Sequence, residues 1–120
     1  MNREILIDCG IDYDGGVEKF MDEAELYERL LMEFPQDNTF DEAKECIEKG
    51  DYDGAAKAVH AMKSVTGTLS MNGLYRLCSR TVDFIRNGEL QKADESFGET
   101  YSGYFKIVKG IEKAKEGGCN

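Results

Sequence analysis

The stretch Ala58–Gly73 reads AVHAMKSVTGTLSMNG and contains the only histidine of the chain, His60. Residues 54–71 carry apolar side chains at helical spacing, which predicts an amphipathic helix. On a helical wheel of about 100° per residue, one face is apolar and is formed by Ala55, Ala58, Met62, Val65, Thr66 and Leu69. The opposite face is formed by His60, Lys63, Ser64, Gly67 and Ala56. We therefore expect the imidazole ring to point away from the core.

Upstream of this helix, the pattern predicts helical structure from about residue 23 to residue 34. Pro35 lacks an amide hydrogen, so the helix should end or kink there. Thr39 followed by Glu42 is a capping-box pattern that would restart the helix, and Gly50 can close it in the left-handed conformation. The pattern leaves open whether residues 23–49 form one kinked helix or two shorter ones.

Asp51 or Asp53 can cap the histidine-bearing helix, which we expect to reach Met71, where Asn72-Gly73 interrupts it. Two more helices are predicted over about 74–86 and 90–115. Residues 1–16 are predicted to form a short N-terminal arm or helix, 17–21 one helical turn, and 116–120 a flexible tail. Four long amphipathic segments joined by short turns predict a single all-α domain over residues 1–120, an antiparallel up-down four-helix bundle.

The chain is acidic, with a formal net charge of −9. This charge argues against nucleic acid and against anionic membrane surfaces as partners. No apolar run approaches the roughly 20 residues of a membrane span. The four cysteines, Cys9, Cys46, Cys78 and Cys119, form no Cys-x-x-Cys pair and cannot build a zinc site with one histidine. We expect reduced thiols, a cytoplasmic location, and no metal or cofactor.

His60 has competing interpretations. It could be an ordinary solvated histidine. Core packing fits poorly, because the helical wheel places His60 opposite the apolar face, and metal binding fits poorly, because a single histidine makes an incomplete ligand set. Gly67 costs about 1 kcal/mol relative to alanine in mid-helix, which suggests that another body approaches the helix closely. A neutral imidazole is a competent nucleophile towards phosphorus, and the ammonium of Lys63, one turn away, suits phosphate oxygens. This face has the features of a reversible phosphoacceptor.

The spacing resembles that of histidine-containing phosphotransfer domains. In that family the histidine is followed by an apolar residue at +2, lysine at +3, a small residue at +4, often a small residue at +7, an apolar residue at +9 and often a small residue at +10. The corresponding residues here are Met62, Lys63, Ser64, Gly67, Leu69 and Ser70. Glu25–Leu31 with Phe34 resembles the family's first long helix, and Gly50-Asp51-Tyr52 resembles the turn before its histidine helix. The resemblance covers roughly residues 10–112. It departs from the family at Ser64, where glycine is common, and at Pro35, where the family continues a helix.

The resemblance implies a phosphorelay intermediate without a cofactor. His60 would accept a phosphoryl group from the aspartate of one receiver domain and pass it to another, and a hybrid sensor kinase is a further possible partner. Lys63 would neutralise phosphate charge, while Ala56, Ser64 and Gly67 would leave clearance for docking. The chain would act as a monomeric phosphocarrier rather than as an independent enzyme.

Two other interpretations remain open at the level of sequence. The chain could be a helical binding module that docks a receiver without phosphoryl transfer, or a helical interaction protein unrelated to phosphorelays. Met71 and Tyr75 are candidates for an apolar docking patch near the histidine helix. Paired acidic residues such as Asp22-Glu23 are interpreted as solvated helix starts rather than as an acid/base site.

Overall fold

The computed structural model describes residues 1–117, which form helices joined by short turns, with no strand in that range. The all-α class is therefore confirmed. The elements are α1 (Arg3–Asp8), α2 (Tyr13–Lys19), α3 (Ala24–Glu33), the 3-10 turn η1 (Phe34–Gln36), α4 (Thr39–Glu48), α5 (Tyr52–Thr68), α6 (Asn72–Arg86) and α7 (Leu90–Gly117).

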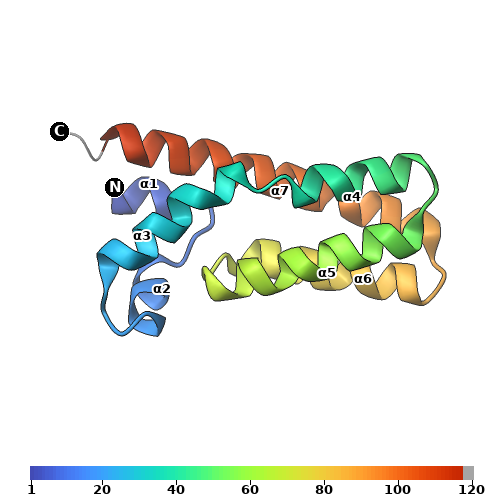
Figure 1. Cartoon of the computed structure of the whole chain (residues 1–120), viewed down its shortest axis with the longest axis horizontal. Coiled ribbons are helices and arrows are strands. Elements are labelled where there is room, and N and C mark those ends of the chain that lie inside the picture. The colour runs from blue at the N-terminus through green and yellow to red at the C-terminus, as the bar shows by residue number, and fades with distance from the viewer. Residues whose placement is uncertain (118–120) are drawn as a thin grey trace.

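α4 packs against α5, α5 against α6 and α6 against α7, and these consecutive helices run in opposite directions (Figure 1). The 28 residues of α7 span about 42 Å at the helical rise of 1.5 Å per residue, which accounts for most of the 47 Å length of the molecule. α1 and α3 pack against α7, and the amide of Asn2 donates to the carbonyl of Ala114 at 3.0 Å. None of the helices within residues 1–117 has both the length and the apolar character needed to span a bilayer.

Residues 1–16, predicted to form a short N-terminal arm or helix, are largely helical, because α1 and the first four residues of α2 lie within them. Each helix is capped by a side chain: Asn2 accepts from the amide of Ile5 at 3.1 Å, and Asp12 accepts from the amide of Gly15 at 3.2 Å. α2 also begins before the helical turn predicted at 17–21. Helices of six and seven residues are too short to show a clear apolar period in sequence.

Residues 23–49 form two helices, α3 and α4, separated by η1. Pro35 lies in η1, where its missing amide hydrogen leaves no helical bond unmade. The predicted capping box is wrong in detail: Thr39 is already the first residue of α4, and the carboxylate of Asp37 accepts from the Thr39 amide at 2.9 Å and from its hydroxyl at 2.6 Å.

The predicted helix ends are partly confirmed. Gly50 and Gly88 both follow helices with φ of 76°, in the left-handed region. Asn72 and Gly73, however, begin α6 rather than interrupting α5; the reversal occurs at Ser70, whose φ is 59°. α7 continues through residues 116 and 117, where a flexible tail was predicted, and residues 118–120 of that predicted tail lie outside the described residues.

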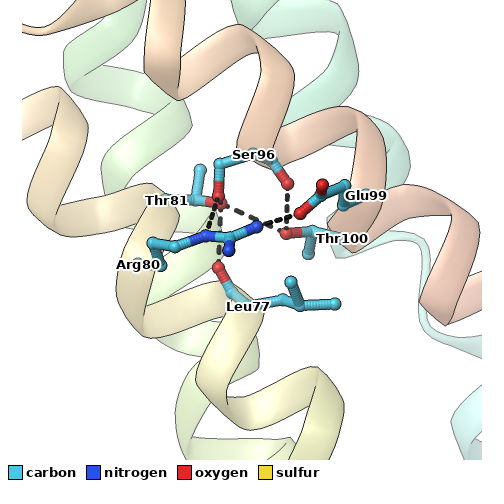
Figure 2. Close-up of polar contacts among 6 residues, drawn as sticks. All are labelled: Leu77, Arg80, Thr81, Ser96, Glu99 and Thr100. Atoms are coloured by element: carbon cyan, nitrogen blue, oxygen red, sulfur yellow. Dashed lines mark hydrogen bonds and ion pairs between the residues drawn. The ribbon is translucent and has the colours of Figure 1, made fainter.

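One large hydrophobic cluster runs through the molecule, and a smaller cluster of Ala55, Ile85 and Ala93 lies beside it. On α7, the apolar side chains of Phe97, Tyr104 and Ile111 are buried, whereas Leu90 is exposed. Buried hydroxyl groups also join α6 to α7 (Figure 2). Thr81 Oγ1 lies 2.7 Å from Ser96 Oγ and 3.1 Å from Thr100 Oγ1, and Arg80 Nε donates to Ser96 Oγ at 3.2 Å. These directional bonds fix how α6 and α7 align.

Candidate functional site

The histidine helix α5 is held at both ends. Its N-cap is Asp51, whose carboxylate accepts from the amide of Gly54 at 2.9 Å. At the other end, the hydroxyl of Tyr27 in α3 donates to the carbonyl of Leu69 at 2.6 Å, and the amide of Asp12 donates to the carbonyl of Ser70 at 2.9 Å. Buried Val59 and Met62 anchor the middle of the helix in the core. These contacts hold α5 in place, so the residues on its outer face have fixed positions.

His60 is exposed on this outer face, as the helical wheel predicts. Its ring forms no hydrogen bond or ion pair with any described residue. An imidazole without a partner keeps both ring nitrogens available to solvent or to a bound group. A second lysine, Lys57, is also exposed one turn before His60 and was not singled out by the sequence pattern.

Lys63 lies one turn after His60 and is half-buried. Its ammonium Nζ lies 5.5 Å from the centroid of the Tyr75 ring, which belongs to the first turn of α6. This separation is within the range of a cation–π interaction. Sequence reasoning gave Tyr75 no link to Lys63, because the contact depends on how α6 crosses α5.

Gly67 lies under the same ring. A Cβ at this position would be 3.2 Å from Tyr75 Cδ2 and 3.3 Å from Cε2, which is closer than side chains normally approach. The carbonyl of Gly67 accepts a hydrogen bond from Lys19 Nζ of α2 at 2.8 Å. The sequence interpretation assigned this glycine to clearance for a partner. The structure provides a nearer reason, because Tyr75 occupies the space that a Cβ would need.

Ser64 and Ala56 differ in their surroundings. Ser64 is exposed and lines a groove of about 330 Å³ between α5 and the α3–η1 segment. The groove has a mainly apolar lining and two carboxylates, and its residues are Leu30, Glu33, Phe34, Asp37, Ser64, Val65, Thr68 and Leu69. Ala56 is half-buried and packs against the small cluster of Ala55, Ile85 and Ala93. Ser64 therefore borders open space, whereas Ala56 is partly covered by the protein itself.

The two residues proposed for an apolar docking patch also differ. Met71 is fully buried, so it cannot contribute to a surface and that prediction is wrong. Tyr75 is 39% exposed, which leaves part of its ring accessible beside Lys63. Below this surface lies Cys78, whose pKa burial raises to about 12, with the charge of Lys63 and a hydrogen bond to Thr66 acting in the opposite direction. Such a buried thiol stays protonated at neutral pH.

The described part of the chain contains no group of three or more His, Cys, Asp or Glu side chains that could hold a metal ion. Comparison with known proteins found no matching family model, no matching curated protein and no matching solved structure. Function is therefore inferred from the residues of α5 and their surroundings.

Proposed function

We propose that the protein is a histidine phosphocarrier that relays phosphoryl groups between receiver domains in the cytoplasm. His60 accepts the group from a receiver aspartate, or from the receiver of a hybrid sensor kinase, and delivers it to a second receiver. The observation that carries the proposal is the exposed, unpartnered ring of His60 midway along α5, with the ammonium of Lys63 one turn away.

The helix arrangement supports the same proposal. From α4 to α7, each helix is antiparallel to the one before it and packs against it, which is the arrangement expected of an up-down four-helix bundle. α3 and η1 extend the first helix of that bundle, and Pro35 lies in η1, where the path of the chain changes between α3 and α4. In this interpretation the bundle acts as a scaffold, and the chain works as a monomer that binds its receivers in turn.

The chemistry requires little from the chain itself. In the neutral form, one imidazole nitrogen carries a lone pair that attacks the phosphorus of the aspartyl phosphate. The N–P bond forms as the acyl O–P bond breaks, and the aspartate leaves as a carboxylate. The other ring nitrogen still carries its proton at this point, so the phosphorylated ring is formally an imidazolium, and loss of that proton to solvent leaves a neutral ring. Lys63 stabilises the charge on the phosphoryl oxygens during the transfer.

The proposal is tested by incubating the protein with a receiver that carries a radiolabelled aspartyl phosphate. We expect label to appear on the wild-type chain, stable in alkali and lost in acid, as a phosphoramidate requires. His60→Gln should remain unlabelled. Labelling of His60→Gln, or no label on the wild type with any receiver encoded in the same genome, would contradict the proposal.

Lysine variants refine this test. Lys63→Ala should slow transfer about ten-fold, because a charge-assisted contact to the phosphoryl oxygens is lost. Lys57→Ala is the matched control, since it removes one exposed lysine at the same sequence separation on the other side of His60. An equal loss of rate in both variants would mean that net charge matters rather than a specific contact by Lys63.

A second candidate function is a binding module that docks a receiver or another signalling protein without phosphoryl transfer. The groove beside Ser64 favours this candidate, because a mainly apolar surface one turn from His60 can bind a partner whatever the ring does. His60→Gln distinguishes the two functions: a binding module keeps its activity in the cell without the imidazole, whereas a phosphocarrier loses it.

A further inference from the structure

We propose that Tyr75 is a positioning residue for the transfer, whose ring keeps the ammonium of Lys63 on the His60 face of α5. The inference rests on the proposed function and deepens it. It assigns a role to a side chain of α6 that the histidine spacing on α5 does not include.

The contact has the geometry that this role requires. Lys63 Nζ lies 5.5 Å from the ring centroid, and Tyr75 is itself held in the first turn of α6, where its amide donates to the carbonyl of Met71 at 2.9 Å. The left-handed residue Ser70 reverses the chain and brings this turn of α6 against the last turns of α5. The position of the Tyr75 ring is therefore set by the first turn of α6 and by the chain reversal at Ser70.

The nature of the partner matters as much as its position. Within the described chain Lys63 forms no ion pair with a carboxylate. A carboxylate would restrain the ammonium but would also cancel its charge. The face of an aromatic ring attracts the cation without supplying a counter-charge and leaves its N–H donors able to reach other acceptors. The lysine is thus restrained and still available to phosphoryl oxygens.

Gly67 completes the arrangement. With a Cβ at residue 67 only 3.2 Å from Tyr75 Cδ2, the ring would have to move by a few tenths of an ångström. Glycine lets the ring lie against the backbone of α5, close to the residue one turn before, which is Lys63. This explains a glycine in the last turn of α5, on the face that carries His60, where helix propensity alone would favour alanine.

The contact itself can be measured without any receiver. Ring currents of Tyr75 should move the proton resonances of the terminal methylene of Lys63 upfield in the wild-type NMR spectrum. We expect this shift to disappear in Tyr75→Leu and to persist in Tyr75→Phe. Lys92, whose Nζ lies 5.9 Å from the Phe84 centroid, is an internal reference that should not change. An unchanged Lys63 shift in Tyr75→Leu would overturn the inference.

The functional role is tested by a double-mutant cycle on the rate of transfer to His60. An exposed cation–π contact favours the position of the Lys63 ammonium over the ring, relative to other positions, by roughly two- to five-fold. Tyr75→Leu should therefore slow transfer by about that factor. Tyr75→Phe should restore the wild-type rate. In a Lys63→Ala background Tyr75→Leu should have no further effect. Equal effects of Tyr75→Leu in both backgrounds, or faster transfer in Tyr75→Leu, would overturn the inference.

Further controls separate this inference from the proposed function. If the wild type takes up no phosphoryl group, the proposed function fails and the role of Tyr75 fails with it. If the wild type is phosphorylated but the cycle is additive, only the role of Tyr75 fails. Should Tyr75→Leu not fold, Gly67→Ala displaces the ring instead, and it should reduce both the Lys63 shift and the transfer rate.

Discussion

The hydroxyl of Tyr27 provides a direct way to perturb the end of the histidine helix. Tyr27 is completely buried in α3, and its hydroxyl donates to the carbonyl of Leu69, the C-cap of α5, at 2.6 Å. Gly16 makes room for this side chain, since a Cβ there would be 2.3 Å from the hydroxyl oxygen. Tyr27→Phe removes the donor and leaves both a buried carbonyl and a small void.

The expected cost can be worked out from these contacts. A buried acceptor that loses its partner costs roughly 1–3 kcal/mol, so we expect the free energy of unfolding to fall by about 2 kcal/mol. Urea denaturation followed by circular dichroism measures this value. If the loss is local, native-state hydrogen exchange of the amides around Ser70 and Met71 should accelerate by about 30-fold, the factor that corresponds to 2 kcal/mol.

Tyr52→Phe is the matched control, because the hydroxyl of Tyr52 donates to Asp94 at 2.9 Å from an exposed position. It should be as stable as the wild type. If Tyr27→Phe were equally neutral, the carbonyl of Leu69 would have another donor and the tie between α3 and α5 would be unimportant. If Tyr27→Phe failed to fold, the hydroxyl would contribute far more than about 2 kcal/mol, because the phenyl ring keeps the packing of Tyr27.

Three further predictions follow from groups elsewhere in the fold. Thr81→Val should lower the free energy of unfolding by about 1 kcal/mol in urea denaturation, because it removes the hydroxyl between α6 and α7; an unchanged midpoint would contradict that role. At pH 8 a thiol reagent should modify half-buried Cys46 before Cys78, whose pKa burial raises to about 12, and peptide mapping by mass spectrometry would reveal the opposite order. Burial, with a hydrogen bond to Glu28, raises the pKa of Tyr13 to about 12, so the folded state holds this proton more tightly than the unfolded state. Its stabilising contribution is therefore complete below pH 10 and lost as pH rises towards 12, which urea denaturation at pH 8 and pH 11 would detect as lower stability at pH 11.

Much of the fold was predictable because the long helices carry one clear apolar face. The segment around Thr81 and Ile85 shows the helical period over four turns, and it forms α6 with those residues buried. The bounds of α1 and α2 were not predicted, beyond a short arm or helix and one helical turn, because the stability of these helices comes from caps and packing rather than from periodicity. Gly16 is the clearest case, since a glycine with low helix propensity is required there by the Tyr27 ring.

The site was predictable to a smaller extent. Helix periodicity alone placed His60 outside the core, because opposite faces of a single helix can be read from spacing. The contact of Lys63 with Tyr75 could not be predicted, since it depends on the turn at Ser70 and on the packing of α6 against α5. The Tyr27–Leu69 hydrogen bond joins residues 42 positions apart and has no signal in the sequence pattern.

The central claim is that a phosphoryl group forms a bond to a nitrogen of His60. Because His60 is the only histidine, ¹⁵N labelling of histidine marks this ring alone. After incubation with a phosphorylated receiver, NMR should detect coupling between ³¹P and one ring nitrogen, and the coupling should disappear on acid treatment. Transfer of phosphate to the chain without any coupling to a ring nitrogen would place the group on another side chain and contradict the account.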